Sequence, residues 1–394
     1  MKNTADLKQK NMLEIIKKMW PSGSISKPDA ARATGLTAVT AHHFLNELTA
    51  KGFAQESGIS EGNTGRKAVI YKLNPDFSYI VGVNIAIDGF TTTISDIYLN
   101  RLYVKQVHCP MEYNDKLLDR MCGEIEEAIN KSNIKIADLF GIGVTVPGQA
   151  QHRNGVVRNL TNVAGWNDIP IKDYFEKLLK TTVFVDNDNN ANALAAKWTG
   201  GFGVKSNAVF LSITNGVGMG ALVNGSILYG SHSSIGEIGH TTICFDGPVC
   251  GCGNKGCIEA LTSNSAIINK LNKKTINDVI NLAKLGDEPT LCVLKEACGF
   301  IGITLEHIIK LYGPEVIIVQ NNWLPEFKDM FFYVLDTVFD RCKWIKRGEV
   351  EIKMNTIDKI NEIGAAALVL EKIFTLSDDN ILFEKLKMHE KLAV

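Results

Sequence analysis

The sequence predicts an α/β protein in which a small, mainly helical N-terminal domain precedes a larger domain of strands and crossover helices. Three observations support this prediction. Residues 1–50 contain three segments of helical periodicity, residues 54–73 alternate like a β-hairpin, and from residue 79 onward apolar strands alternate with amphipathic helices. A chain of 394 residues suffices for two or three domains, and we predict a boundary between residues 1–75 and 76–394.

The N-terminal domain has the pattern of a helix-turn-helix followed by a wing. The first helix is predicted from four apolar residues at helical spacing, Met12, Ile15, Ile16 and Met19. Ser26 can cap a second helix that runs to about residue 34, and Thr37 can cap a third that runs to about residue 51. Gly35 supplies the turn between them. Two helices joined by a short glycine turn, with a hairpin after them, are typical of a winged helix-turn-helix.

The charge distribution favours DNA as the partner of this domain. Residues 1–75 carry 11 Lys and Arg against 6 Asp and Glu, whereas the rest of the chain carries 31 against 37. We predict DNA contacts at eight residues: Lys27, Ala38, Val39, Thr40, His42, His43, Arg66 and Lys67. The third helix has no arginine, so it would read bases through weaker hydrogen bonds and methyl contacts. A helical protein-interaction module is the alternative.

The larger domain is predicted from a series of strands and helices. Strands are expected at residues 79–87, 91–98, 102–108, 139–146, 183–185 and 350–354, and helices at residues 115–130, 191–198, 289–312 and 325–342. The strand at residues 183–185 ends in Asp186-Asn187-Asp188-Asn189-Asn190, just before a helix. Polar residues at this position face ligands in open α/β sheets, although Asp188 could be only a helix cap.

A cluster of metal-ligating residues follows at residues 240–257. His240, Cys250, Cys252 and Cys257 supply the imidazole and thiolate donors that tetrahedral zinc prefers, and we predict a structural zinc site. Gly251, Gly253 and Gly256 are expected to allow a tight turn between the thiols. Unligated thiols beside an ordinary histidine are the alternative. Glu237 and Glu259 flank the cluster, where a rigid loop would hold them ready to accept hydrogen bonds from hydroxyl groups.

The run Gly236–His240 followed by Cys250–Glu259 resembles the sugar-binding and zinc signature of the ROK family (repressors, open reading frames and sugar kinases). The resemblance covers nearly the whole chain, because the N-terminal domain is similar to the winged helix of ROK repressors. It implies a two-lobed, actin-like (ribonuclease-H-like) ATPase fold. It also implies sugar contacts at six residues, Asn162, Asn187, Asp188, Glu237, His240 and Glu259, with Asp188 at the position of the kinases' catalytic base.

The sequence departs from the ROK sugar kinases where those enzymes hold nucleotide. Residues 84–88, Asn-Ile-Ala-Ile-Asp, stand where the kinases have Asp-x-Gly-Gly-Thr, and Thr214 replaces a glycine of the second phosphate loop, which retains Gly216, Gly218 and Gly220. Residues 320–323, Gln-Asn-Asn-Trp, replace the glycine pair beside the adenine, and Ala196 replaces a glutamate. We therefore predict that the chain is not an enzyme.

The resemblance thus implies a sugar-responsive transcriptional repressor of carbohydrate-utilisation genes, which binds double-stranded operator DNA as a homodimer or homotetramer. The run Val185–Asp188 favours xylose over glucose and N-acetylglucosamine, and whether the sugar is an inducer or a corepressor stays open. The alternatives are a ROK sugar kinase with an appended DNA-binding domain and a regulator that responds to a protein partner. We expect a cytoplasmic protein without membrane contact, since Met1–Thr4 begins no apolar signal and no apolar run is long enough to span a bilayer.

Overall fold

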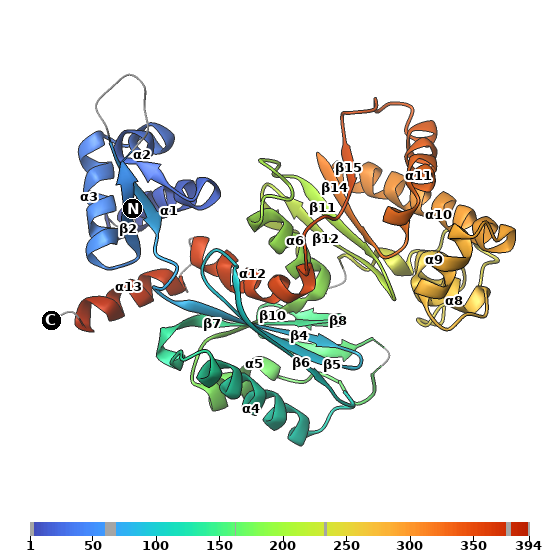
Figure 1. The fold of residues 1–394 in the computed structure, drawn as a ribbon, viewed down its shortest axis with the longest axis horizontal. Helices are drawn as coiled ribbons and strands as arrows, with labels where there is room; N and C mark the ends of the chain where they lie inside the picture. The colour runs from blue at the N-terminus through green and yellow to red at the C-terminus, as the bar shows by residue number, and fades with distance from the viewer. Residues whose placement is uncertain (1–3, 60–67, 162, 232–234, 376–379, 393–394) are drawn as a thin grey trace. The chain divides into compact units, whose positions relative to one another are not determined.

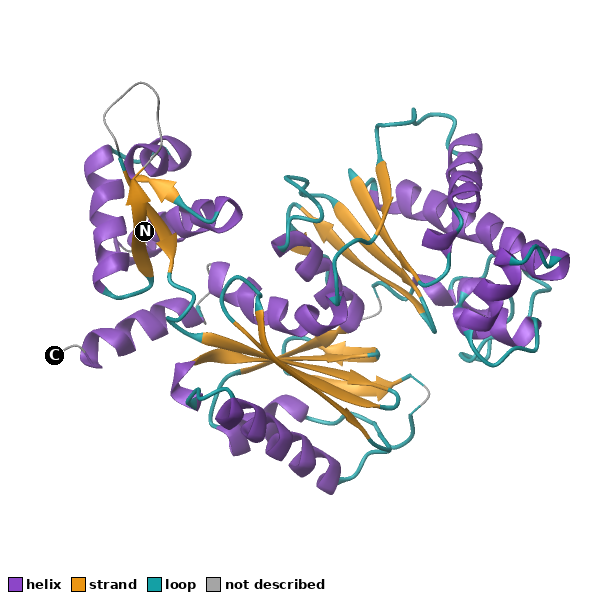
Figure 2. Ribbon diagram, viewed as in Figure 1, coloured by secondary structure: helices purple, strands orange, loops and turns teal. Residues whose placement is uncertain are grey.

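The computed structural model describes residues 4–59, 68–161, 163–231, 235–375 and 380–392 (Figure 1). The chain divides into two compact units, Met1–Asp188 with Asn361–Val394, and Asn189–Ile360. Both combine helices and strands, as the predicted α/β class requires (Figure 2). None of the described helices combines the length and the apolar character that crossing a lipid bilayer requires.

The N-terminal domain of the first unit has the predicted helix-turn-helix. It contains α1 (Thr4–Ser22), α2 (Lys27–Thr34) and α3 (Ala38–Ala50). The Ser26 hydroxyl accepts a hydrogen bond from the Asp29 N–H, and the Thr37 hydroxyl accepts one from the Thr40 N–H at 3.1 Å, which confirms both predicted caps. Gly35 ends α2 with φ of 68°, a left-handed conformation that glycine adopts without strain.

The predicted hairpin is also present, and it gains a third strand. β2 (Ala54–Ile59) and β3 (Val69–Leu73) pair in antiparallel fashion, and the short β1 (Ile25–Ser26) pairs with β3 at Tyr71 and Ile70. β1 was not predicted, because a two-residue strand has no periodicity of its own. The tip of the hairpin, residues 60–67, lies outside the described residues, and so do the predicted DNA contacts Arg66 and Lys67.

The rest of the first unit, which we call the first lobe, is built on a five-stranded sheet of order β10-β7-β4-β5-β6. β4, β5 and β6 form an antiparallel meander, and β7 and β10 are parallel to β4. β5 ends at Ser95, earlier than predicted, because the Asp96 carboxylate accepts hydrogen bonds from the N–H groups of Tyr98 and Asn100 and makes a turn there. The elements are β4 (Tyr79–Ala86), β5 (Gly89–Ser95), β6 (Arg101–His108), α4 (Asp115–Lys131), η1 (Ile136–Asp138), β7 (Leu139–Val146), β8 (Gly148–Gln151), β9 (Val156–Leu160), α5 (Ile171–Leu179), β10 (Val183–Asn187), α12 (Ile360–Phe374) and α13 (Ile381–Leu392).

The second unit, which we call the second lobe, repeats this topology. Its sheet has the order β13-β12-β11-β14-β15, with β11, β12 and β13 antiparallel and β14 and β15 parallel to β11. The duplication was not visible in the sequence. The elements are α6 (Asp188–Trp198), β11 (Ala208–Ile213), β12 (Val217–Val223), β13 (Ser226–Ile227), η2 (Ile238–His240), α7 (Ile258–Thr262), α8 (Asn264–Lys270), α9 (Ile276–Lys284), α10 (Glu288–Tyr312), β14 (Val316–Asn321), η3 (Leu324–Glu326), α11 (Lys328–Arg341) and β15 (Glu351–Met354).

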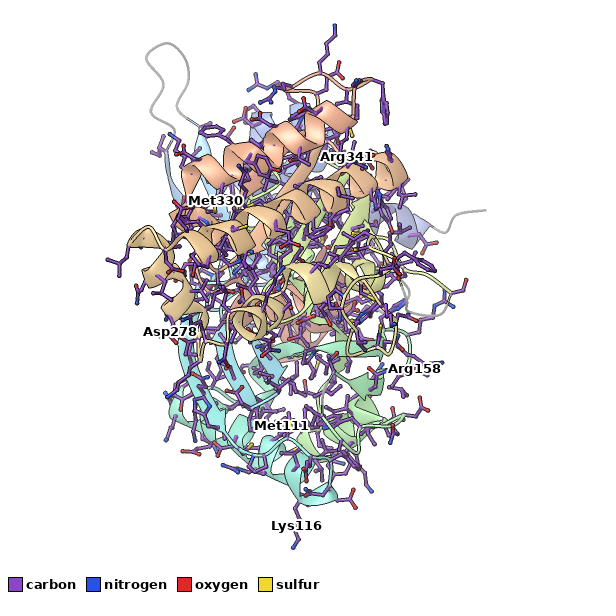
Figure 3. The ribbon with its side chains drawn as sticks, turned by 90° about the vertical axis from the view of Figure 1, so that its right-hand side faces the viewer. Met111, Lys116, Arg158, Asp278, Met330 and Arg341 are labelled. Carbon is purple, nitrogen blue, oxygen red and sulfur yellow. The ribbon has the colours of Figure 1, made fainter. Side chains whose placement is uncertain are left out.

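A charged contact joins the two long helices of the second lobe. Figure 3 labels Met330 and Arg341 near the two ends of α11. The Arg341 Nε donates to the Glu306 carboxylate of α10 at 3.0 Å. Glu306 is buried and also pairs with Lys310, so its charge is compensated, and these cations keep its pKa below the usual range despite burial.

In each lobe, glycines in the sheet allow one helix backbone to approach closely. In the first lobe, α4 and α5 cover one face and α12 the other (Figure 1). A Cβ added at Gly143 would overlap the carbonyl oxygen of Ala365 in α12, and one added at Gly82 would lie 3.1 Å from the Ala366 nitrogen. In the second lobe, a Cβ at Gly220 would lie 2.3 Å from the backbone carbonyl oxygen of Asn189 in α6. These glycines are therefore packing residues.

Gly143→Ala should destabilise the protein by several kcal/mol, because the new methyl group must displace α12 from β7. Gly123→Ala in α4 is the matched control, since no described atom lies within 4 Å of its added Cβ. We expect that change to stabilise the protein by up to about 1 kcal/mol through helix propensity. Thermal unfolding measures both, and equal stability of the two variants would contradict the packing role of Gly143.

Candidate functional site

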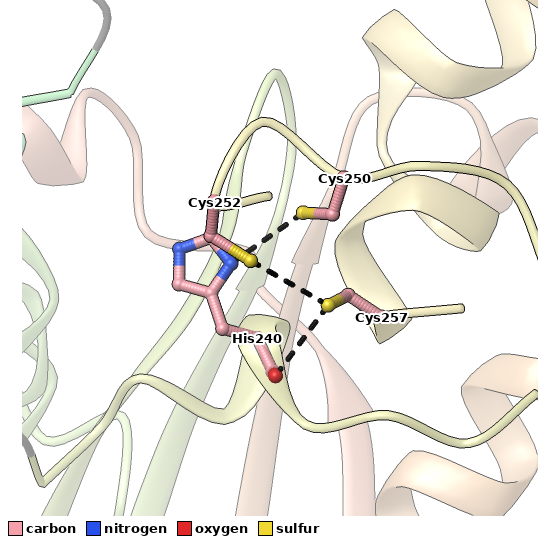
Figure 4. A group of neighbouring side chains, drawn as sticks. All are labelled: His240, Cys250, Cys252 and Cys257. Atoms are coloured by element: carbon pink, nitrogen blue, oxygen red, sulfur yellow. Dashed lines mark hydrogen bonds between the residues drawn. The ribbon is translucent and has the colours of Figure 1, made fainter. Parts of the chain in front are cut away.

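The predicted metal ligands converge in the second lobe (Figure 4). The ligand atoms of His240, Cys250, Cys252 and Cys257 all lie within 4.8 Å of one another. The Cys252 and Cys257 sulfurs are 3.7 Å apart, and the Cys250 sulfur is 3.6 Å from His240 Nδ1. Thiolates bound to one zinc ion at about 2.3 Å are about 3.7 Å apart at tetrahedral angles. The donor set and its spacing therefore fit a zinc ion.

The loop that carries the thiols depends on two of the three predicted glycines. Gly253 and Gly256 have φ of 91° and 63°, and a Cβ at Gly256 would overlap the Cys244 carbonyl oxygen. The Gly253 N–H donates to the Cys250 carbonyl at 2.9 Å and closes the turn between the thiols. The expectation for Gly251 is wrong, because its φ is not left-handed and no described atom lies within 4 Å of an added Cβ.

The protein holds two of these thiols in their protonated form when no metal is bound. Burial raises the pKa of Cys250 and raises that of Cys257 to about 12, whereas the Asn254 N–H lowers the pKa of the exposed Cys252. Zinc binds thiolates, so binding must release protons from Cys250 and Cys257. Metal affinity should therefore fall as the pH is lowered.

Two carboxylates border the metal cluster. Glu237 Oε2 is 3.8 Å from Nε2 of His240, the ring nitrogen on the side away from the thiols, and burial raises the pKa of Glu237. Glu259 Oε2 accepts a hydrogen bond from the Val217 N–H at 3.0 Å, while its Oε1 lies 3.9 Å from the Cys250 sulfur. A metal bound to His240 Nδ1 would thus fix the ring whose Nε2 faces Glu237, while the Val217 N–H holds Glu259. Three predicted sugar contacts, Glu237, His240 and Glu259, form one cluster.

The other predicted sugar contacts belong to the first unit. Asn187 is the last residue of β10, and its side-chain amide donates to the Gly148 carbonyl at 2.8 Å. Asp188 follows as the first residue of α6. The contact of Asn187 with Gly148 was not predicted, although the Pro147-Gly148 pair that ends the apolar strand could have drawn attention to this position. Asn162 lies outside the described residues.

The outer face of α3 presents four of the eight predicted DNA contacts to solvent. Ala38, Val39, His42 and His43 are exposed, and the Val39 side chain is exposed to 79%. Thr40 is half-buried, with its hydroxyl 2.8 Å from that of Thr37.

Two further polar residues of the N-terminal domain, Asn46 and Lys27, bear on this surface. Asn46 was not among the predicted contacts, although it lies one turn beyond His42 with its Nδ2 3.2 Å from His42 Nε2. Lys27 lies outside α3, with its ammonium 5.4 Å above the centre of the Tyr71 ring. The outer face of α3 thus carries methyl, imidazole and amide groups but no guanidinium group.

Comparison with known proteins places this architecture in a family. The model of the ROK family matches residues 80–372. A xylose repressor of Caldicellulosiruptor bescii is 27% identical over 96% of this chain and 100% of its own length. The crystal structure of a ROK family transcriptional regulator, a homolog of the Escherichia coli MLC protein, superimposes with a TM-score of 0.82 at 23% identity, over 97% of this chain and 99% of that one.

A ROK hexokinase from Thermus thermophilus gives a TM-score of 0.64 at 24% identity, over 74% of this chain and 97% of its own. At these identities the two structural similarities show the fold alone. They confirm the predicted class, a winged helix-turn-helix followed by a two-lobed, actin-like fold.

Purified protein should contain one zinc ion per chain, and Cys252→Ser should reduce the zinc content and lower the melting temperature, because one of four ligands is lost. Cys292→Ser, at an exposed cysteine of α10, is the matched control and should change neither value. Elemental analysis and thermal unfolding give the readouts. Full zinc occupancy in Cys252→Ser would exclude this thiol as a ligand.

Proposed function

The chain belongs to the ROK family, and on this premise we propose that it is a sugar-responsive transcriptional repressor. The observation that carries the proposal is the full-length similarity to a xylose repressor, which includes the N-terminal domain. The ROK hexokinase matches nearly to its full length but covers only 74% of this chain. The part of this chain that the hexokinase does not cover supports DNA binding as the response to the sugar.

We assign operator binding to residues 1–75 and effector binding to residues 76–394. Helix α3 is the recognition helix, which lies in the major groove with the Val39 methyl groups and the His42 and His43 imidazoles toward base edges. Lys27 and the wing residues Arg66 and Lys67 contact phosphates. We propose a homodimer or homotetramer, since two recognition helices on one operator supply the affinity that a single helix without arginine lacks.

For the effector we propose a monosaccharide, with xylose favoured by the similarity to a xylose repressor. Its hydroxyl groups donate to the carboxylates of Glu237 and Glu259, with His240 beside them, and the family resemblance adds Asn162, Asn187 and Asp188. Zinc, when bound, is structural and supplies no reaction chemistry. It would hold the thiol loop and His240, and through His240 the neighbouring Glu237, in the geometry that recognises the sugar.

The packing of the second lobe supports signalling over phosphoryl transfer. Trp323 follows β14, where ROK kinases have a glycine pair, and it is fully buried in the core. The Asn321 side chain accepts hydrogen bonds from the N–H groups of Trp323 and Leu324, and it donates to the Ile213 carbonyl. These residues are occupied by internal contacts, which supports a lobe that no longer cradles phosphates.

Xylose should weaken binding to an operator selected from a random duplex library, as measured by fluorescence anisotropy. Glu237→Gln should weaken the sugar response about 10–100-fold, because an amide N–H donor replaces one of the two acceptor oxygens, while DNA affinity without sugar stays unchanged. Glu296→Gln, an exposed glutamate paired with Lys270, is the control. If no common aldose or amino sugar changes DNA affinity, the effector role is wrong. Sugar-dependent ADP release that Asp188→Asn abolishes would instead support a kinase.

Val39→Asp should reduce operator affinity more than tenfold, since it places a carboxylate against base edges and phosphates. The control is Val204→Asp, at a fully exposed valine of the second lobe. Zinc content and melting temperature should be the same in both variants. Unchanged operator binding by Val39→Asp would show that α3 is not the recognition helix.

A further inference from the structure

The N-terminal domain is packed against the first lobe by aromatic rings. Trp20, near the end of α1, stacks on Tyr98 with ring centres 5.4 Å apart and an interplanar angle of 15°. The same indole contacts Phe374, the last residue of α12, at 5.3 Å and 59°. Trp20 and Phe374 are buried, and Tyr98 is half-buried. The three rings therefore connect α1 to the turn after β5 and to the end of α12.

Tyr98 holds the N-terminal domain at a second point. Its hydroxyl donates to the carbonyl of Leu73, the last residue of β3, at 3.1 Å. Its own backbone is fixed by the buried Asp96, whose carboxylate accepts from the Tyr98 N–H at 2.8 Å and from the Asn100 side chain at 2.8 Å. Tyr98 thus contacts both a helix and the wing of the N-terminal domain from a turn that is rigid in the first lobe.

The connecting segment between the N-terminal domain and the first lobe is also packed. Phe77 makes an edge-to-face contact with Phe53 at 5.1 Å and a tilted contact with Phe140 of β7 at 6.0 Å. The Asn74 side chain donates to the Gly52 carbonyl at 3.0 Å. A flexible tether would leave such groups solvated. The N-terminal domain is therefore oriented by the first lobe.

Helix α12 gives this junction a connection to the effector residues. The chain returns from the second unit to the first at residues 360–361, where α12 begins. Gly82 and Gly143 place the α12 backbone directly against β4 and β7, so the helix moves with the sheet as one body. One end of α12 thus continues from the unit that carries Glu237, His240 and Glu259, and the other end contacts Trp20.

We propose that Tyr98 is the positioning residue through which effector binding changes the orientation of the DNA-binding helices. The proposal rests on the proposed function and adds the contacts that transmit the effector signal. These are the contacts of α12 and of the turn after β5 with Trp20 and Leu73. Tyr98 binds neither sugar nor DNA. Its loss should leave both affinities intact and remove only the free energy that couples them.

Tyr98→Ala tests this route in the full-length protein. Operator affinity is measured by anisotropy with and without saturating xylose, and xylose affinity by calorimetry with and without operator. In the wild type we expect the two ratios to agree, at about 5–150-fold, because coupling is reciprocal. In Tyr98→Ala both ratios should fall close to one, while the affinity for each ligand alone stays at the wild-type value. Tyr98→Phe keeps the ring stack and should retain most of the coupling.

Tyr333→Ala, at a partly exposed tyrosine of α11, is the matched control and should keep wild-type coupling. Phe374→Leu provides a second test from the α12 side if Tyr98→Ala does not fold, and it should also reduce the coupling. Wild-type coupling in Tyr98→Ala, or a loss of sugar-free operator binding, would overturn the proposal. If operator binding by the wild type is not coupled to any sugar, the proposed function fails. This outcome is distinct from a failure of the Tyr98 proposal, in which the wild type shows coupling and Tyr98→Ala retains it.

Discussion

The structure depends on the close approach of a helix backbone to glycines in each sheet. In the first lobe, α12 lies against Gly82 and Gly143, and in the second lobe α6 lies against Gly218 and Gly220. A side chain at these positions would separate helix and sheet, and each lobe would lose the cover of one face. Because α6 follows the fifth strand of the first sheet and α12 follows the fifth strand of the second, both contacts lie next to the points where the chain passes from one unit to the other.

The repeated strand order explains how functional residues are distributed. Each lobe has an antiparallel meander followed by two parallel strands, and polar residues gather where strands end. Asn187 ends β10 of the first sheet, while Glu259 bonds to the N–H of Val217 at the start of β12 in the second. The thiol loop and η2 then bring Glu237 and His240 to the same cluster. The four candidate metal ligands and the two candidate sugar-binding carboxylates thus lie together in the second lobe.

In the proposed function, the side chains that the second lobe buries distinguish a sensor from a kinase. Asn321 at the end of β14 and Trp323 just after it make internal contacts, and under the proposal Asp188, at the position of a catalytic base, lacks the phosphate positioning that phosphoryl transfer needs. Under the proposal, the free energy of sugar binding would be available to shift a conformational equilibrium. The packed junction at Trp20 is the connection that we propose between that shift and the DNA-binding helices.

The sequence by itself determined the features that depend on near neighbours in the chain. The caps Ser26 and Thr37, the strand and helix periodicities and the Cys-His spacing are local, and the structure confirms that the ligand atoms converge. Only the tertiary structure decided the duplicated sheet order and the packing role of Gly143. It also showed that Gly251 does not need the backbone conformations reserved for glycine, and that the rings of Trp20, Tyr98 and Phe374 contact one another. These features join residues far apart in the chain, and no local periodicity or spacing records which distant surfaces will meet.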